Sequence, residues 1–441
     1  MFSKILVANR GEVAIRVIRS CKEMGISTVS VYSEADRDSL HIALADQSIC
    51  IGSAALPDSY LNAERIVSAA IATGAQAIHP GYGFLSENAA FARLCEEYGI
   101  AFIGPPSGVI SKTGDKDAAR RVMQDTGVPV IPGTGILEDA KAAAKAARRI
   151  GYPLMIKACA GGGGKGIRIV AENSEIENAF LTAAREAQEA FGDGALYMEK
   201  RIFPAKHIEV QLIADEYGKI ICFGERECSI QKNNQKLLEE SPSPAVNDAL
   251  REKLYGAAEK AAEAIGYVSA GTVEFLLDTD GNFYFMEMNA RLQVEHAVTE
   301  QVTGIDLVKW QIRVAAGVPF DFCQEDVTLA GNSIECRINA ASPGKVGFLH
   351  IPGGPRVRFD SALWTGCTVP PYYDSLLGKL IVHAATREEA IRKMHAALCE
   401  LVIEGVPNNI DEQIEIISDE RFRRGEYYTD FFGNVVNKNG A

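Results

Sequence analysis

Short apolar runs and segments with helical apolar spacing alternate along the first hundred residues. Residues 4–8 are apolar, and apolar side chains then recur at helical spacing up to Gly25, namely Val13, Val17, Ile18, Cys21 and Met24. This pattern predicts a strand followed by a helix that ends at the glycine, and residues 28–32 predict the next strand. Such a strand–helix–strand unit favours a parallel, doubly wound sheet. The turn at residues 9–11 lacks G-x-G-x-x-G, so the pattern does not favour a dinucleotide site.

Two later segments combine a turn with a helix start. Residues 79–91, HPGYGFLSENAAF, follow the apolar residues 75–78, and either Ser86 or Asn88 could cap the next helix. The turn is either a plain connection or a ligand loop, since ligands of such sheets bind at the carboxyl ends of strands. Farther on, Asp115 could cap a helix that stops at Gly127, which puts Lys116 in its first turn. The helix dipole disfavours a cation there unless an anion lies nearby.

A glycine-rich segment, KACAGGGGKGIRIV, covers residues 157–170. β-Branched residues follow the glycines, whereas a phosphate-binding P-loop would continue as a helix. The pattern therefore predicts two strands joined by a glycine loop, with Lys157 before the loop and Lys165 within it. Glycine allows close backbone approach to an anion and large hinge motions. We interpret the segment as a flap that closes over phosphates, and the alternative is a surface turn.

Acidic and amide residues gather in residues 271–296, GTVEFLLDTDGNFYFMEMNARLQVEH. Residues 273–277 and 283–288 predict two strands, and a four-residue turn would place Asp278 opposite Phe283 and Glu274 opposite Glu287. Opposed carboxylates destabilise a sheet by up to about 1 kcal/mol unless a cation lies between them. Alternation places further polar residues on one face: Glu287, Asn289, Arg291, Gln293 and Glu295. Two acids and an amide suit Mg²⁺ or Mn²⁺, and the alternative is a polar outer strand face.

Length, charge and cysteine spacing narrow the class of protein. A chain of 441 residues predicts about three domains. Its net charge of −13 argues against binding to nucleic acid or an anionic membrane. No apolar run reaches the roughly 18 residues of a membrane span, and Arg10, Glu12 and Arg16 interrupt the N-terminal segment, which excludes a signal peptide. The ten cysteines lack CxxC spacing, so we expect reduced thiols in a cytoplasmic protein.

Motifs along essentially the whole chain resemble those of one family. They are ILVANRGEVAIR, HPGYGFLSENA, IKACAGGGGKGIRIV, CSIQKNNQK, FYFMEMNARLQVEHAVTE, ECRINA and VPPYYDSLLGKLI. In this order they resemble biotin carboxylase, the ATP-grasp subunit of biotin-dependent carboxylases, and above all that of acetyl-CoA carboxylase. The resemblance implies an α/β and α+β fold with a Rossmann-like domain (residues 1–113), an ATP-grasp domain (114–330) whose mobile glycine-rich lid covers about 131–203, and a C-terminal biotin carboxylase domain (331–441).

The resemblance also implies a two-step reaction. Bicarbonate attacks the γ-phosphate of ATP to give carboxyphosphate and ADP. Carboxyphosphate breaks down to CO₂ and phosphate, the phosphate takes the proton of the biotin ring nitrogen, and the biotin anion captures CO₂. Phosphoryl transfer of this kind depends on positioning and positive charge.

Residue roles follow from the matching motif positions. Metal ligands would be Glu274, Glu287 and Asn289. Phosphate contacts would be Lys116, Lys157, Gly162, Gly163, Gly164, Lys165 and Gly166. The adenine hinge and other nucleotide contacts would be Glu199, Lys200, Ile202, His207, Gln231, Asn234 and Leu276. Bicarbonate would meet Lys236, Arg291, Gln293, Val294 and Glu295, with Glu295 as its base. Arg337 would stabilise the biotin enolate, and Tyr82 would lie near the biotin ring.

The sequence departs from the family pattern at three places. Asn234 stands where the family often has His, Ala297 replaces the Pro of HPVTE, and the loop after Ala340 is short. The first puts a ribose or phosphate contact in doubt, and the last could change biotin access, carrier docking or the acceptor, or be a harmless surface deletion.

The expected partners follow from what the chain lacks. No segment resembles a biotin attachment site, and no room remains for a carboxyltransferase. We therefore expect a homodimeric subunit that acts on a separate biotin carboxyl carrier protein and serves separate carboxyltransferase subunits. The alternatives are a subunit of another acyl-CoA or 2-oxoacid carboxylase, an ATP-grasp ligase with a non-biotin acceptor, and a nucleotide-binding regulatory subunit, against which the intact acidic and basic residues argue.

Overall fold

A parallel sheet of five strands, ordered β3-β2-β1-β4-β5, forms the N-terminal part of this computed structural model, which describes residues 1–114, 116–159 and 167–433. β1 pairs in parallel with both β2 and β4, so the predicted strand–helix–strand unit is confirmed. Asn88, rather than Ser86, caps the helix after the HPGYGF turn, because its side chain accepts a hydrogen bond from the Phe91 amide. The elements are β1 (Lys4–Val7), α1 (Gly11–Glu23), β2 (Ser27–Ser33), α2 (Leu40–Leu44), β3 (Gln47–Gly52), α3 (Ala63–Thr73), β4 (Ala77–His79), α4 (Ala89–Glu97), β5 (Ala101–Phe102) and α5 (Ser107–Gly114).

Two imidazoles are buried in this N-terminal part. Burial lowers the pKa of His41 to about 4 and that of His79 to about 3. Nδ1 of His79 accepts a hydrogen bond of 3.0 Å from the Gly81 amide, which requires the neutral ring. Because the folded-state pKa of each ring lies below the unfolded value of 6.5, its contribution to stability is present above pH 6.5 and is lost as the pH falls toward these values.

We therefore expect acid to destabilise the N-terminal part through His79. As the pH falls from 6.5 to about 4.5, one such ring should lower the free energy of unfolding by about 2–3 kcal/mol. The His79→Asn variant keeps an acceptor for the Gly81 amide but cannot be protonated, so its urea midpoint should fall less between pH 7 and 4.5. Equal losses in wild type and variant would contradict this assignment.

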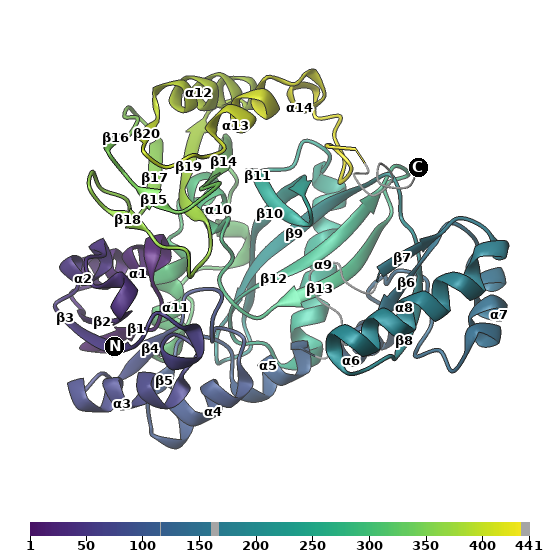
Figure 1. Cartoon of the computed structure of the whole chain (residues 1–441), viewed down its shortest axis with the longest axis horizontal. Coiled ribbons are helices and arrows are strands. Elements are labelled where there is room, and N and C mark those ends of the chain that lie inside the picture. Colours follow the sequence, from purple (N-terminus) through teal and green to yellow (C-terminus); the bar gives the residue numbers. More distant parts are fainter. Residues whose placement is uncertain (115, 160–166, 434–441) are drawn as a thin grey trace.

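An antiparallel sheet of eight strands, ordered β13-β12-β9-β10-β11-β14-β19-β17, forms the body of the molecule. β11 pairs with β14, so one continuous sheet carries the central strands and those near the C-terminus (Figure 1). The first group consists of α6 (Lys116–Asp125), β9 (Ala205–Ala214), β10 (Ile220–Lys232), β11 (Gln235–Ser241), α9 (Asp248–Ile265), β12 (Ser269–Asp278), β13 (Phe283–Asn289), α10 (His296–Thr303) and α11 (Leu307–Ala315). Asp115, the expected cap of α6, lies outside the described residues.

The second group begins with β14 and contains three helices that lie together at the top of the view (Figure 1). Its core includes Leu380, Met394 and Leu398. Its elements are β14 (Asn332–Asn339), β15 (Gly344–Lys345), β16 (Phe348–His350), β17 (Val357–Ser361), β18 (Thr368–Val369), β19 (Leu376–Ala384), α12 (Arg387–Glu400), β20 (Val402–Glu404), α13 (Ile410–Ser418) and α14 (Glu420–Arg424). In the described part of the chain, no helix has the length and apolar character needed to span a membrane.

A separate sheet of three strands, ordered β7-β6-β8, lies within residues 131–203, the segment expected to form the lid, and projects to one side (Figure 1). Its elements are α7 (Ala140–Ile150), β6 (Leu154–Ala158), β7 (Ile167–Val170), α8 (Ile176–Phe191) and β8 (Leu196–Lys200). β6 and β7 are antiparallel, with Lys157 opposite Ile167, so the two strands predicted around the glycines are confirmed. The loop residues Gly162, Gly163, Gly164, Lys165 and Gly166 lie outside the described residues.

Candidate active site

Glu274 of β12 lies directly opposite Glu287 of β13, as the sequence predicts. The predicted register beyond this pair is wrong, because Leu277, not Asp278, faces Phe283. The Asp278 carboxylate instead accepts hydrogen bonds from the backbone amides of Asp280 and Asn282, which extends the turn. A register shift between Glu274 and Phe275 restores the pairing of the two glutamates. Glu274 and Glu287 therefore lie opposite each other at the β-bulge of the β12–β13 hairpin.

The Glu274 carboxylate is held by four side chains. It accepts hydrogen bonds from Nδ2 of Asn289 (2.7 Å) and Nε2 of Gln293 (3.0 Å), and it lies 2.8 Å from His207 Nε2 and 3.3 Å from Lys236 Nζ. Burial raises its pKa, but Lys236 and His207 lower it further, to about 2. Glu274 is therefore an anion at neutral pH. Glu274 and Glu287 offer carboxylate oxygens, which Mg²⁺ prefers as ligands, whereas Asn289 points its amide nitrogen at Glu274 and its oxygen at Arg291.

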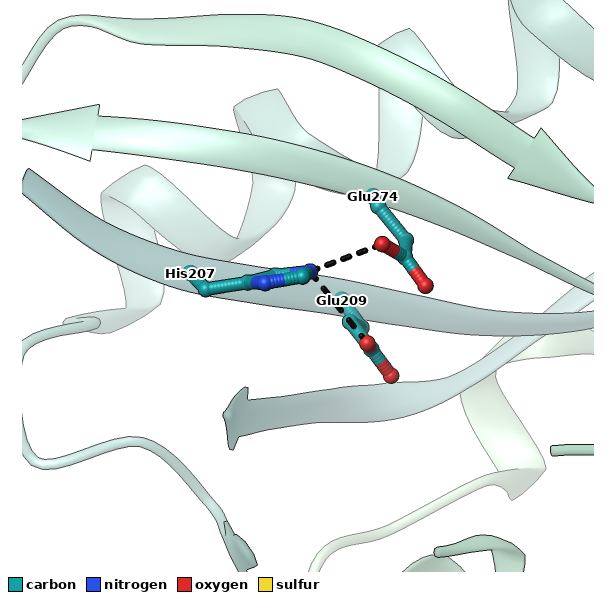
Figure 2. A group of neighbouring side chains, drawn as sticks. All are labelled: His207, Glu209 and Glu274. Carbon is teal, nitrogen blue, oxygen red and sulfur yellow. Dashed lines mark ion pairs between the residues drawn. The ribbon is translucent and has the colours of Figure 1, made fainter. Parts of the chain in front are cut away.

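His207, Glu209 and Glu274 come together from β9 and β12 (Figure 2). Nε2 of His207 lies 3.3 Å from Glu209 and 2.8 Å from Glu274, and the Gln231 amide lies 2.8 Å from its Nδ1. Burial lowers the pKa of His207, but the two carboxylates raise it to about 9. The two carboxylates thus favour the protonated ring, whereas Nε2 of Gln231, which donates to the Cys228 carbonyl, faces Nδ1 as a donor and favours the neutral ring. The ring lies between the two acids and neutralises part of their charge when it is protonated.

A buried chain of alternating charges continues from this triad. Lys236 Nζ contacts Glu209 and lies 2.8 Å from Glu295, and Arg337 donates to Glu295 (2.8 Å) and, through Nε, to Glu239 (2.6 Å). Behind Glu209 lies the fully buried Arg226. Burial raises the pKa of Glu295, but Lys236 and Arg337 lower it below its usual value. Glu295 is therefore an ionised carboxylate held between two cations.

The loop after β13 brings the remaining predicted residues to the same place. β13 ends at Asn289, so the prediction that Arg291, Gln293 and Glu295 share an extended strand face is wrong. Side-chain hydrogen bonds replace the strand geometry: Arg291 donates to Gln293 Oε1 (2.7 Å) and to Asn289 Oδ1 (3.2 Å). Gln293 in turn donates to Glu274, so these contacts hold the loop against the acids of the sheet.

Sequence reasoning missed three acidic residues of this site. Glu87 accepts a hydrogen bond of 2.8 Å from Arg291, whereas Glu209 and Glu239 pair with Lys236 and Arg337. Glu87 lies in the HPGYGFLSENAAF turn, and alternation in HIEVQ places Glu209 on the same face of β9 as His207. The turn motif and the strand alternation were the sequence signals for Glu87 and Glu209. Neither signal predicts which basic residue the acid contacts.

The predicted nucleotide residues lie on the three-stranded sheet and on the main sheet. Lys157 pairs with Glu199 across β6 and β8 at 2.7 Å, and Lys200 donates to the Tyr152 carbonyl at 2.7 Å. Leu276 lies opposite His207 in the β12–β9 pair, and Ile202 follows β8. Lys116 is the first residue of α6.

Asn234 has a structural explanation. With Asn233 it forms the two-residue turn between β10 and β11, where both residues have positive φ (53° and 61°). Asparagine adopts this conformation more readily than most residues, as hairpin turns of this length require. Tyr82 lies in the turn after β4, and its hydroxyl donates to Glu12 of α1.

Comparisons with known proteins identify the family. Three family descriptions match the chain: "Biotin carboxylase, N-terminal domain" over residues 1–110, "Carbamoyl-phosphate synthase L chain, ATP binding domain" over 115–322, and "Biotin carboxylase C-terminal domain" over 335–434. Biotin carboxylase 1 of Bacillus subtilis is 52% identical, and the alignment covers 98% of each chain.

Two solved structures share the whole fold. The biotin carboxylase of Campylobacter jejuni superimposes with a TM-score of 0.94 at 48% identity, covering 98% of both chains. The biotin carboxylase domain of Hydrogenobacter thermophilus 2-oxoglutarate carboxylase, a dimer with MgADP, ADP and bicarbonate, has a TM-score of 0.92 at 50% identity, covering 98% of this chain and 97% of that one. The chain therefore belongs to the biotin carboxylase family of ATP-dependent ATP-grasp ligases.

Proposed function

We propose that the chain carboxylates biotin on a separate biotin carboxyl carrier protein, with ATP and bicarbonate as the other substrates. The observation that carries this proposal is the position of Glu295, 2.8 Å from both Lys236 and Arg337 and connected through Lys236 to the opposed pair Glu274/Glu287. A base between two cations suits an anion such as bicarbonate, and the acidic pair suits the metal of a nucleotide. The Hydrogenobacter thermophilus relative, solved with MgADP and bicarbonate, supports both ligands.

The residues divide the work as follows. Glu295 takes the proton of bicarbonate, whose oxygen then attacks the γ-phosphate while Lys236 and Arg291 balance its charge. Carboxyphosphate and ADP form, carboxyphosphate gives CO₂ and phosphate, and the phosphate takes the proton of the biotin nitrogen. The biotin anion then attacks CO₂, which forms the N–carboxyl bond. Arg337 stabilises the negative charge on the biotin oxygen, and Tyr82 lies against the ring.

Glu274, Glu287 and Asn289 would hold Mg²⁺, or Mn²⁺ in its place, which neutralises charge on the ATP phosphates when bound. Lys116, Lys157 and the glycine loop with Lys165 would contact those phosphates. Glu199, Lys200, Ile202, His207, Gln231, Asn234 and Leu276 would surround the rest of the nucleotide. Gln293 and Val294 complete the bicarbonate site.

We further propose that this reaction is the first half of acetyl-CoA carboxylation, in fatty-acid synthesis. The chain would work as a cytoplasmic homodimer with separate carboxyltransferase subunits, in domains 1–113, 114–330 and 331–441. The buried free thiols Cys21, Cys95 and Cys222 support a reducing compartment. The second candidate is the same half-reaction in a 2-oxoacid carboxylase, because the 2-oxoglutarate enzyme is equally similar.

The test is phosphate release from ATP by the purified protein, with and without bicarbonate and free biotin. Bicarbonate should be required, and ¹⁴C-labelled bicarbonate should yield acid-labile carboxybiotin. Phosphate release with no dependence on bicarbonate would contradict the proposal. Adding the carrier and transferase subunits of each candidate pathway would then separate acetyl-CoA from 2-oxoacid acceptors.

The Glu287→Gln variant tests the metal site. We expect it to fold normally but to need about tenfold more Mg²⁺ for half-maximal turnover, because one charged oxygen ligand becomes neutral. A magnesium titration of ATP cleavage at fixed free ATP measures this shift. An unchanged magnesium requirement would contradict the assignment.

A further inference from the structure

Lys379 is a buried cation outside the residues discussed so far. It lies on β19 with no exposed surface, and its Nζ donates a hydrogen bond of 2.7 Å to the Val294 carbonyl and lies 3.4 Å from Glu12 Oε1. Glu12 belongs to the first turn of α1, and Val294 belongs to the loop after β13. One ammonium group therefore joins three segments that are far apart in the sequence. Burying such a group is costly unless its partners are well placed.

The contact with Val294 determines how the backbone of its loop is oriented. The Gln293 carbonyl lies 2.8 Å from the His296 ring, and the Val294 carbonyl accepts from Lys379. In a trans peptide the N–H points away from the C=O of the same unit. Fixing these two carbonyls therefore fixes the directions of the Val294 and Glu295 amides. Neither amide has a hydrogen-bond acceptor among the described residues, so both can donate to a ligand.

The contact with Glu12 connects Lys379 to Tyr82, the residue predicted to lie near the biotin ring. Glu12 is buried and accepts the hydroxyl hydrogen bond of Tyr82, whose ring centroid lies 5.9 Å from Lys379 Nζ. β19 also pairs with β14 so that Lys379 lies opposite Arg337. Lys379 thus contacts the Val294 carbonyl, in the loop proposed to bind bicarbonate. It also contacts Glu12, which accepts the hydrogen bond of Tyr82.

We propose that Lys379 is a positioning residue, which holds the Val294–Glu295 amides toward bicarbonate and holds Tyr82 in place through Glu12. This inference rests on the proposed function in that bicarbonate is taken as the ligand of the loop. Lys379 itself touches no substrate. Its effect is to keep the Val294–Glu295 amides and Tyr82 at a fixed separation. Small displacements of reacting groups can cost about 100-fold in rate.

The test compares Lys379→Met with Lys206→Met. Lys206 is a matched control: it is also buried, donates to the carbonyls of Gly425 and Tyr427, and lies 3.6 Å from a glutamate, Glu227. In Lys379→Met the KM for bicarbonate should rise about 10- to 100-fold while the KM for ATP changes by less than about twofold. In Lys206→Met both constants should stay near wild type. An unchanged bicarbonate KM, or equal shifts of both constants in Lys379→Met, would overturn the proposal.

Hydrogen exchange gives a readout that does not depend on activity. The 290–298 segment should exchange at least about tenfold faster in Lys379→Met than in wild type, and Lys206→Met should leave it unchanged. If Lys379→Met does not fold, Glu12→Gln keeps the Val294 contact and should speed exchange near Tyr82 alone; no change there would overturn the proposal. A wild-type protein without bicarbonate-dependent turnover would refute the proposed function, whereas unchanged exchange of the 290–298 segment in a folded Lys379→Met protein would refute the role of Lys379.

Discussion

Glu295→Gln is expected to depress both phosphate release and biotin carboxylation, by about 10²- to 10⁴-fold. Glu295 is fully buried, and Lys236 and Arg337 keep it ionised. The amide has nearly the same shape but cannot take the proton of bicarbonate. Because that proton transfer precedes carboxyphosphate, both products should fall together. Parallel assays of phosphate and of carboxybiotin measure the two losses.

The matched control for this variant is Glu227→Gln. Glu227 is also a buried glutamate of the main sheet, but its oxygens accept hydrogen bonds from the hydroxyls of Ser229 and Ser243. This substitution should leave both rates within about threefold of wild type. If Glu295→Gln kept full phosphate release, another group would have to be the base.

The Arg337→Gln variant should separate the two half-reactions. Arg337 is proposed to act after carboxyphosphate has formed, by stabilising the biotin oxyanion, and a group of this kind is worth about 10²–10³ in rate. Carboxybiotin should fall by that factor. Bicarbonate-dependent ATP cleavage should fall much less, because Lys236 still lies 2.8 Å from Glu295.

Arg387→Gln provides the control for lost packing and charge. Arg387 pairs with Glu240 at 2.6 and 2.9 Å, just as Arg337 pairs with the neighbouring Glu239 of β11. Both arginines thus neutralise a buried carboxylate of the same strand. Among the described residues, however, Arg387 contacts none that is proposed to bind substrate. Equal losses of phosphate and carboxybiotin in Arg337→Gln would contradict its role.

Local patterns in the sequence predicted the elements that depend on near neighbours. The strand–helix–strand unit at the N-terminus, the strands around the glycines and the Glu274/Glu287 pair all follow from spacing within about 30 residues. The bulge near Phe275 was missed because it depends on how the Asp278 side chain binds the turn amides. The overall assembly of domains came from the motif resemblance instead of from periodicity.

Contacts between distant segments could not be predicted from such spacing. Arg337 and Glu239 are 98 positions apart, and Lys379 and Val294 are 85 apart. Alternation shows which face of a strand each residue occupies, but not which strand lies beside it. The continuous sheet from β13 to β17 supplies that information, and it explains why Glu209, Glu239 and Lys379 emerged only with the structure.

Oxygen transfer from bicarbonate to phosphate tests the central claim most directly. The wild-type protein is supplied with ATP, biotin and ¹⁸O-labelled bicarbonate, and the released phosphate is analysed by mass spectrometry. If bicarbonate attacks the γ-phosphate, the oxygen that forms the new bond remains on phosphate when CO₂ leaves, so about one labelled oxygen per phosphate is expected. Phosphate without label, released at the same rate, would show that water attacks instead and would contradict the account.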